Sequence, residues 1–381
     1  MKRTLGILIA SENTEWTSMP LLGKPCRMHV EQSLSDAGFS MAAMPPADAE
    51  TLQALIANDV STALLANENA PCLNAATYRE LQKAAASRPS AVLLGDMATP
   101  LAMAFPAAVL RELPLKGKLT LSRLIEALND RNLAVKVVHA QSPEAYIAVN
   151  NAESYSAAYQ YLRAEIVRKH MQNGVIILDP EHTVIEANVS IGKGTVIYSG
   201  NTLQNGTEIG AGCTLYPNSR IEGSVIGNEV TVESSVLLHC RVGARTTVGP
   251  FAYLRPEACV GEHCRIGDFV EIKNSVIGDG TKVSHLTYVG DADLGKDINL
   301  GCGTVFVNYD GKVKNRSRVD DHAFIGCNCN LIAPVHVGQN AYLAAGSTLV
   351  EDVPENALYV ARSRGVIKED WVKRRKEEGK L

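Results

Sequence analysis

The feature that most constrains this chain is a six-residue repeat of aliphatic side chains between residues 185 and 350. Its three long series are Ile185, Ile191, Ile197, Leu203, Ile209, Leu215 and Ile221; Val242, Val248, Leu254, Val260, Ile266 and Ile272; and Val319, Ile325, Leu331, Val337, Leu343 and Leu349. Its three short series are Ile226, Val232 and Leu238; Ile277, Val283 and Val289; and Leu294, Leu300 and Phe306.

A period of six fits neither the 3.6-residue turn of an α-helix nor the two-residue alternation of an amphipathic strand. One short strand and one corner per hexad satisfy it, and three hexads close a triangular coil with the aliphatic residues stacked inside. Gly and Asn beside these residues tolerate the left-handed backbone of sharp corners. We therefore expect a parallel β-helix of about nine or ten coils. The alternative is a β-sandwich whose periodicity is accidental.

The first 176 residues follow a different pattern, in which apolar strands alternate with helices. We expect strands at 5–9, 62–65, 91–94 and 134–138, and helices at 30–37, 75–86, 121–128 and 154–171. This alternation predicts an open α/β sheet. Pro106, Pro114 and Gly117 interrupt the middle of the region. The expected parts are thus an α/β domain at 1–176, a β-helix at 177–351 and a charged tail at 352–381 that can form a short capping helix.

Composition restricts the possible partners. The 381 residues allow two or three domains, and the net charge of −4 points to neither nucleic acid nor an anionic membrane. The first ten residues are too short for a signal peptide, and no apolar run reaches membrane length, so we expect a cytoplasmic protein. Nine cysteines without a Cys-x-x-Cys pair predict reduced thiols used for packing, and no metal site is expected.

Four motifs occur in order within the repeat region. They are Gly-Pro-Phe-Ala-x-Leu-Arg-Pro at 249–256, Phe-Val-Glu-Ile-Lys at 269–273, His-Leu-Thr-Tyr-Val-Gly-Asp at 285–291 and Asn-Tyr-Asp-Gly at 308–311. Together they resemble the acetyltransferase domain of the bacterial bifunctional glucosamine-1-phosphate acetyltransferase/N-acetylglucosamine-1-phosphate uridylyltransferase family, over roughly residues 177–371. The resemblance implies a left-handed parallel β-helix of hexapeptide repeats and a homotrimer with active sites between subunits. The implied reaction is acetyl transfer from acetyl-CoA to the amine of glucosamine-1-phosphate, a step towards UDP-N-acetylglucosamine and the cell wall.

The resemblance assigns the role of general base to His285. An amine is mostly protonated at neutral pH, so a base must remove a proton before or during attack on the acetyl carbon, and histidine suits that task. Glu271 is expected to accept from the other ring nitrogen and to orient the imidazole. The alternative for His285 is a surface histidine on a coil.

Substrate binding follows from the same resemblance. Arg255 and Lys273 are 18 residues apart, which is one coil, so they should stack on one side of the prism and hold the phosphate. The other residues that the resemblance assigns to the sugar phosphate are Tyr288, Asn299, Asn308, Tyr309 and Lys314. Salt bridges are the alternative for the cations, and corner positions for the asparagines. The polar segment 308–318 is too hydrophilic to pack on its own coil and is expected to reach a neighbouring subunit.

Acetyl-CoA needs a groove along the coils with cations for its phosphates. The resemblance assigns Cys302, Cys327 and Ala345 to the pantetheine arm, and Arg362 and Lys368 to the phosphates. The two cysteines depart from the small or hydroxylated residues usual in the family. They keep nearly the same volume, so we expect binding to survive.

The N-terminal region resembles the family's nucleotidyltransferase domain only in fragments, and it is shorter. The fragments are Leu-Gly-Lys-Pro at 22–25, Ala-Val-Asn-Asn at 148–151 and a late helix at 118–125. The family's Gly-rich phosphate loop is replaced by Ser-Glu-Asn-Thr-Glu-Trp at 11–16, and its metal-holding Gly-Asp-Val-Pro by Glu-Asn-Ala-Pro at 68–71. Acidic and bulky side chains oppose a polyanion, and an amide binds Mg²⁺ more weakly than a carboxylate. We expect this domain to be inactive and Mg²⁺ not to function there.

Three other functions compete with glucosamine-1-phosphate acetylation. The same chemistry can act on another amino sugar or a nucleotide sugar. A metal-dependent hydratase like the γ-carbonic anhydrases needs three convergent histidines, two of them five residues apart, and no pair here has that spacing. A non-catalytic scaffold leaves the combination of motifs unexplained.

Overall fold

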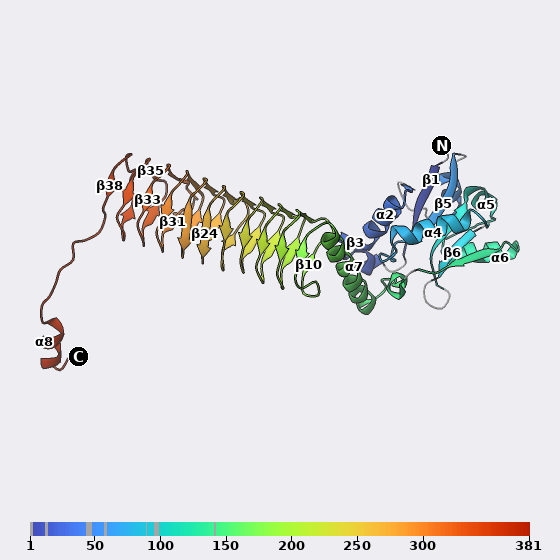
Figure 1. Cartoon of the computed structure of the whole chain (residues 1–381), viewed down its shortest axis with the longest axis horizontal. Coiled ribbons are helices and arrows are strands. Elements are labelled where there is room, and N and C mark those ends of the chain that lie inside the picture. The colour runs from blue at the N-terminus through green and yellow to red at the C-terminus, as the bar shows by residue number, and fades with distance from the viewer. Residues whose placement is uncertain are drawn as a thin grey trace. The chain divides into compact units, whose positions relative to one another are not determined.

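The computed structural model describes residues 3–11, 14–42, 48–56, 59–88, 90–94, 99–140 and 142–381 (Figure 1). The chain forms two compact units. Unit 1 comprises Met1–His170 and Val184–Asn188, and unit 2 comprises Met171–Thr183 and Val189–Leu381.

Unit 1 is built on a mixed sheet with the strand order β4-β1-β5-β7-β6-β8. The strands of this unit are β1 (Arg3–Ile9), β2 (Pro20–Leu21), β3 (Lys24–Pro25), β4 (Ser40–Met41), β5 (Val60–Asn67), β6 (Ser90–Leu94), β7 (Pro100–Pro106) and β8 (Val135–Val138). The helices are α1 (Thr14–Ser18), α2 (Cys26–Asp36), α3 (Ala49–Leu55), α4 (Ala75–Ala85), α5 (Ala107–Glu112), α6 (Leu121–Asp130), the 3-10 helix η2 (Pro143–Tyr146) and α7 (Ala152–Gln172).

Both faces of this sheet are covered. Helices α3, α5 and α6 pack on one face, around Leu52, Leu110 and Leu124. Helices α2 and α4 pack on the other, around Leu34 and Tyr78. A strand buried on both faces reads as a continuous apolar run, and β5 is such a strand.

The expected open α/β sheet is confirmed, and so are the four expected strands and four expected helices. Strand β7 was not expected, because Pro106 was interpreted as an interruption. Pro106 is the last residue of β7, which runs antiparallel to both β5 and β6. A strand tolerates proline at its end, where a missing N–H costs little.

Unit 2, together with the segment Val184–Asn188, forms a parallel β-helix of three walls, seen in Figure 1 as the stacked coils from β10 to β38. Wall 1 contains β10 (Val184–Ile185), β13 (Thr202–Gln204), β16 (Arg220–Glu222), β19 (Val236–Leu238), β22 (Tyr253–Leu254), β25 (Glu271–Lys273), β28 (Tyr288–Gly290), β31 (Val305–Val307), β34 (Asn330–Ile332) and β37 (Thr348–Leu349). Wall 2 contains β11 (Ser190–Ile191), β14 (Glu208–Ile209), β17 (Val225–Ile226), β20 (Arg241–Val242), β23 (Cys259–Val260), β26 (Val276–Ile277), β29 (Ala292–Leu294), β32 (Ser317–Val319) and β35 (His336–Val337). Wall 3 contains β9 (Ile176–Ile177), β12 (Val196–Ile197), β15 (Thr214–Leu215), β18 (Thr231–Val232), β21 (Thr247–Val248), β24 (Arg265–Asp268), β27 (Lys282–His285), β30 (Asn299–Leu300), β33 (Phe324–Ile325), β36 (Tyr342–Leu343) and β38 (Leu358–Tyr359).

The hexad residues fill the interior as expected, except that Ile191 is only partly buried and that one prediction names the wrong leucine. Leu237 is fully buried and pairs with Ile221 below and Leu254 above, whereas Leu238 is partly exposed. The step from Val232 to Leu237 is five residues, one fewer than a hexad. Counting strictly by six therefore predicted Leu238 as the inward residue.

The residues beside the hexads form a second buried layer at the corners. The hydroxyl of Thr246 donates to the carbonyl of Gly261 at 2.8 Å, and the thiol of Cys264 donates to that of Gly278 at 3.2 Å. Six of the nine cysteines are buried and all nine are free, which confirms packing as the role of those six. Burial raises the pKa of the Cys240 thiol to about 11.

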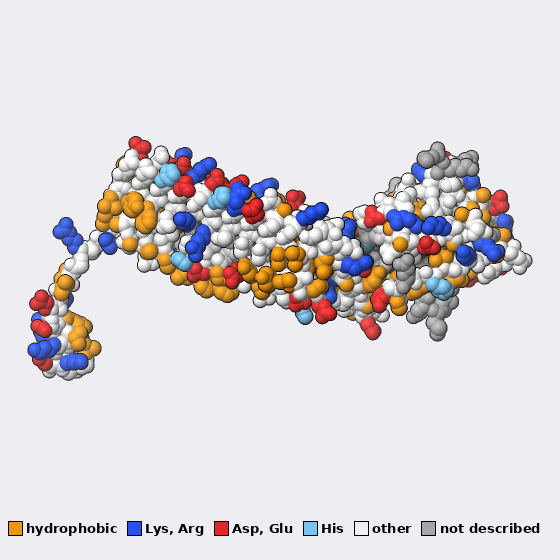
Figure 2. Space-filling view, in the orientation of Figure 1, with side chains coloured by type: hydrophobic (Ala, Val, Ile, Leu, Met, Phe, Trp, Pro, Cys, Tyr) orange, Lys and Arg blue, Asp and Glu red, His pale blue; other side chains and the backbone are white. Residues whose placement is uncertain are grey.

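The corners do not need Gly or Asn at every left-handed position. Phe251, Phe269 and Leu286 have φ of 58°, 55° and 47° and expose more than half of their side chains. The tail contains α8 (Trp371–Glu377), none of whose residues is buried, so the expected helix is present but does not cap the prism. No described helix combines the length and the apolar character needed to cross a bilayer. On the face that Figure 2 shows, acidic and basic side chains are interspersed along the β-helix.

Candidate active site

One corner of the prism, between walls 3 and 1, carries the predicted base and the predicted coenzyme-lining residues. Asp268, His285, Cys302, Cys327 and Ala345 occupy the same position in successive coils. Asp268 pairs with His285 in the strand register. The later coils are joined by backbone hydrogen bonds one residue beyond this position. The amides of Gly303, Asn328 and Gly346 donate to the carbonyls of His285, Cys302 and Cys327 at 3.4, 2.8 and 2.8 Å, respectively. We call this row the His285 corner.

The imidazole of His285 is half exposed at this corner, and its Nδ1 lies 2.5 Å from Oδ1 of Asp268. This hydrogen bond is the main cause that lowers the pKa of the Asp268 carboxyl below its ordinary value. No other described side chain forms a hydrogen bond with the imidazole. Its Nε2 lies on the side of the ring opposite Asp268. An imidazole held in this way can accept a proton at Nε2.

The expected contact between Glu271 and His285 is wrong for the chain described here. Glu271 accepts a hydrogen bond from Nη1 of Arg255 at 2.7 Å, and Asp268 takes the place on the imidazole. The register explains the exchange, because Glu271 lies on wall 1 between Tyr253 and Tyr288. Asp268 stands three residues earlier, at the corner directly below His285.

Arg255 and Lys273 stack on the same wall, as their spacing predicts. The residues before them, Leu254 and Ile272, are paired in the register of β22 and β25, so the two cations are one coil apart. The ammonium of Lys314 lies beside Lys273 and lowers the pKa of Lys273, with smaller contributions from desolvation and Arg255, while Asp291 opposes the shift. Three cations therefore gather on wall 1, an arrangement that favours an anion. We call them the cation cluster.

Asn308 is nearly buried and donates to the carboxylate of Asp291, which also accepts from Asn274 at 2.6 Å. Burial alone raises the pKa of Asp291, but these two hydrogen bonds and the charges of Lys273 and Lys314 together outweigh it, and the pKa lies below its ordinary value. In the free chain Asn308 therefore supports the start of the polar loop.

The polar loop after Asn308 is held on its own coil, which corrects the expectation that it does not pack there, while its reach to a neighbouring subunit stays a prediction. The carboxylate of Asp310 accepts from the amides of Lys312 and Val313 at 2.8 and 2.7 Å. Arg316 forms an ion pair of 2.5 Å with Asp293 on wall 2. Tyr309 remains exposed, with its hydroxyl donating to the backbone 2.7 Å away.

Three predicted residues lie apart from the cation cluster. Asn299 is on wall 3, in the outward row that continues with Phe324 and Tyr342. Arg362 and Lys368 are exposed in the tail beyond β38. Asp268 is the residue that sequence reasoning missed, and its position one coil below His285 was the available signal.

The fragments of a nucleotide site in unit 1 are bonded to one another. The amide side chain of Asn69 donates to Oδ1 of Asn150 at 2.7 Å, and the amide of Ser11 donates to the Glu68 carboxylate at 2.8 Å. Asn151 caps α7, because its Oδ1 accepts from the amide of Ser154 at 2.9 Å. Of the replaced segment at 11–16, residues 12 and 13 lie outside the described residues.

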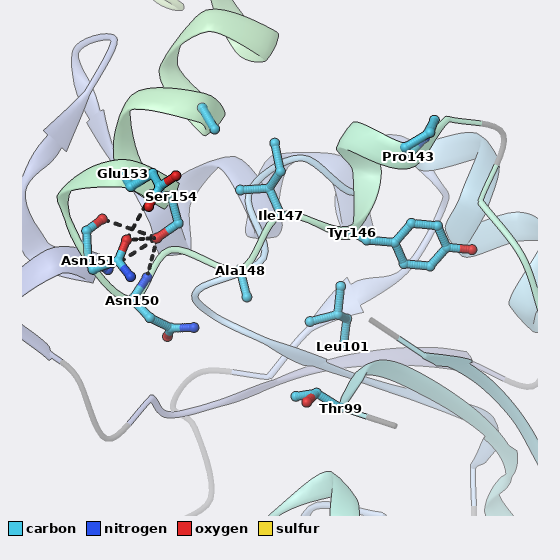
Figure 3. Close-up of a pocket in the computed structure, with 11 residues that line it drawn as sticks. Thr99, Leu101, Pro143, Tyr146, Ile147, Ala148, Asn150, Asn151, Glu153 and Ser154 are labelled. Carbon is cyan, nitrogen blue, oxygen red and sulfur yellow. Dashed lines mark hydrogen bonds between the residues drawn. The ribbon is translucent and has the colours of Figure 1, made fainter. Parts of the chain in front are cut away.

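A pocket of about 460 Å³ lies beside these groups (Figure 3). Its polar end is formed by Asn150, Asn151 and Ser154, and its apolar side by Leu101 and Tyr146. Its lining is therefore both polar and apolar, and the residues named here include no lysine or arginine.

The six-residue repeat of this chain is similar to that of a known class, the bacterial hexapeptide-repeat transferases. Residues 239–274 match the family model described as bacterial transferase hexapeptide (six repeats).

Among curated proteins, the chain is related to the bifunctional protein GlmU, and the resemblance drawn from its motifs is confirmed. It is 50% identical over 257 residues to that of Clostridium acetobutylicum, covering 68% of this chain and 56% of the relative. It is 55% identical over 229 residues to that of Clostridium botulinum, covering 60% and 50%. The chain thus spans about half the length of the curated relatives it matches.

Solved structures show weaker likenesses. A nucleotidyl transferase from Methanothermobacter thermautotroptrophicus has a TM-score of 0.36 and 14% identity, over 42% of this chain and 97% of the other. A UDP-N-acetylglucosamine acyltransferase from Campylobacter jejuni has a TM-score of 0.34 and 17% identity, over 54% and 82%. At these TM-scores neither likeness refines the description of the fold.

Proposed function

We propose that this chain is an acetyl-CoA-dependent N-acetyltransferase that converts glucosamine-1-phosphate to N-acetylglucosamine-1-phosphate. The observation that carries the proposal is the cation cluster of Arg255, Lys273 and Lys314 on the wall that begins at the His285 corner. A sugar phosphate with an amine matches this arrangement, because the cations bind its phosphate while the imidazole meets its amine.

In the proposed reaction, Nε2 of His285 takes a proton from the substrate amine, whose nitrogen attacks the acetyl carbon of acetyl-CoA. The N–C bond forms, the C–S bond breaks, and the departing CoA thiolate takes up a proton. The carboxylate on Nδ1 stabilises the imidazolium that forms. A base positioned in this way contributes roughly 10² to 10⁴ in rate.

Acetyl-CoA is proposed to lie along the His285 corner. Cys302, Cys327 and Ala345 follow His285 coil by coil, which would bring the thioester to the imidazole and lead the pantetheine arm towards the tail. Arg362 and Lys368 are proposed to bind the phosphates of the coenzyme.

Asn299, Asn308, Tyr288 and Tyr309 are proposed to contact the sugar. Asn299 lies on a different wall from the cation cluster, so a complete site needs a second copy of the chain. A cytoplasmic homotrimer with active sites between subunits meets this requirement.

Release of CoA thiol tests the proposal directly. The chain is incubated with acetyl-CoA and either glucosamine-1-phosphate or an amino-bearing UDP-sugar, and free thiol is measured with a chromogenic disulfide. We expect rapid release with the sugar phosphate only. Faster release with the UDP-sugar would support the alternative of a nucleotide-sugar acetyltransferase. No release with either acceptor would support the alternative of a non-catalytic scaffold.

We further propose that unit 1 does not transfer a uridylyl group. The side chain of Asn69 supports this, because an amide that donates to Asn150 stands where the resembling family holds its metal with a carboxylate. Incubation with UTP, Mg²⁺ and N-acetylglucosamine-1-phosphate should yield no UDP-sugar.

A further inference from the structure

The carboxylate on His285 comes from the coil below it. Asp268 is the last residue of β24 and His285 the last of β27, and the two are paired in register. The amide that follows His285 donates to the carbonyl of Asp268 at 3.0 Å, which fixes the two corners on each other. Side chains at equivalent positions of stacked coils point the same way, so the carboxylate meets Nδ1.

This pair differs from the other histidine–carboxylate pairs of the β-helix. The carboxylate on His182 belongs to Asp179 and also accepts from Ser199 at 2.7 Å. The carboxylate on His336 belongs to Asp320 and is shared with Arg318 at 2.7 Å.

By contrast, no described side chain other than His285 donates to the Asp268 carboxylate, and the pair stands at an open corner. The closest approach of His322 to a carboxylate is 3.8 Å. The Asp268 carboxylate is therefore dedicated to one imidazole.

A carboxylate in this position has two effects on an imidazole. It accepts the Nδ1 proton, which leaves the lone pair of Nε2 free to take a proton from substrate. Its charge also stabilises the imidazolium produced by that transfer. Because Glu271 is bound to Arg255, it supports the cation cluster instead.

We propose that Asp268 is the positioning residue of His285, and that Glu271 positions Arg255 for the substrate phosphate. This inference rests on the proposed acetyl transfer and assigns the two carboxylates of the motif region to two different tasks. The charged or titratable groups on the elements packed around the pair are Arg265, Lys282, Glu271, Lys273, Tyr288 and Cys302.

The first test is kinetic. Asp268→Asn keeps an acceptor for Nδ1–H but removes the charge, and Asp268→Ala removes both. We expect kcat to fall about tenfold to a hundredfold in Asp268→Ala and less in Asp268→Asn, with KM for glucosamine-1-phosphate nearly unchanged. Glu271→Gln should instead raise KM, since it loosens the phosphate-binding arginine. The matched control is Asp179→Asn, which breaks a histidine–carboxylate pair at the far end of the β-helix and should leave kcat unchanged.

The second test needs no substrate. The tautomer of the His285 imidazole is read from the ring-nitrogen chemical shifts of the nitrogen-15-labelled chain, with His182 in the same spectrum. In Asp268→Ala the resonances of His285 should change, because Nδ1–H loses the carboxylate that accepts its proton. Asp179→Asn should change only the resonances of His182.

The outcomes separate the two proposals. An active natural chain with an unchanged kcat in Asp268→Ala, or an unchanged His285 tautomer, overturns the role of Asp268 and leaves the proposed function intact. A natural chain that releases no CoA with glucosamine-1-phosphate, while the His285 tautomer changes in Asp268→Ala, overturns the proposed function and leaves the pairing.

Discussion

The two units of this chain differ in what their polar side chains do. In unit 1 the polar groups just after β1 and β5 are bonded to each other, as with Ser11 and Glu68. In unit 2 three cations gather on one wall, and the neighbour of Lys273 is a second ammonium. The core of unit 1 is nevertheless complete on both faces of its sheet. A fold is maintained by its buried apolar residues, whereas a site depends on a few exposed side chains that can change separately.

The largest expected effect tests the unit in which we place the chemistry. His285→Ala should lower acetyl transfer by roughly 10² to 10⁴, because the amine then loses its base. His182→Ala, at another exposed histidine–carboxylate pair, should have no effect. CoA thiol release measures both. Equal rates in His285→Ala and the natural chain would remove the contrast between the units.

A smaller effect is expected at the cation cluster. A hydrogen bond to a charged group is worth about 1.5–3 kcal/mol, so Lys314→Met should raise KM for glucosamine-1-phosphate by about tenfold to a hundredfold. Lys376→Met, on α8, is the control with the same change in charge.

The pH dependence of the same variant gives a second measurement. Lys314 lowers the pKa of Lys273, so in the natural chain phosphate binding weakens as pH rises through this lowered value. Without Lys314 the pKa of Lys273 returns towards its ordinary value, and the loss of binding should occur at higher pH. The measurement is KM for glucosamine-1-phosphate against pH. If KM rises at the same pH in Lys314→Met as in the natural chain, the gathering of these cations is contradicted.

The smallest effect is expected in unit 1. Asn69→Asp restores a carboxylate where the resembling family holds its metal, but the segment at 11–16 still lacks glycines and cations for a triphosphate. UDP-sugar formation from UTP should stay undetectable, while acetyl transfer remains at its natural rate. Chromatography of the nucleotide products measures UDP-sugar formation. If Asn69→Asp or the natural chain forms UDP-sugar, unit 1 has kept more of the nucleotidyltransferase site than we propose.

Most of the fold could be predicted because it depends on local and repetitive signals. The six-residue period placed nearly every inward residue of the β-helix, and it failed at Leu238, where one coil step is a residue short. In unit 1 the strands with continuous apolar runs were found. Strand β7 was not, although it too is a continuous apolar run, because Pro106 at its end was interpreted as an interruption.

The candidate site could be predicted in part. The spacing of Arg255 and Lys273 placed them correctly one coil apart. The polar loop was expected to leave its own coil, but Arg316 reaches Asp293 on wall 2 and holds it there. Such a partner lies 23 residues away in the sequence and cannot be identified from the composition of the loop.

The sequence by itself determined the repeat, the interior of the prism and the motifs that collect around His285, because a period of six has few structural solutions. Only the tertiary structure decided which carboxylate meets the imidazole. Asp268 and Glu271 are three residues apart, but the corner between them turns their side chains onto different walls. In a β-helix each residue contacts the equivalent positions of the coils above and below, and the register of those coils selects its partner.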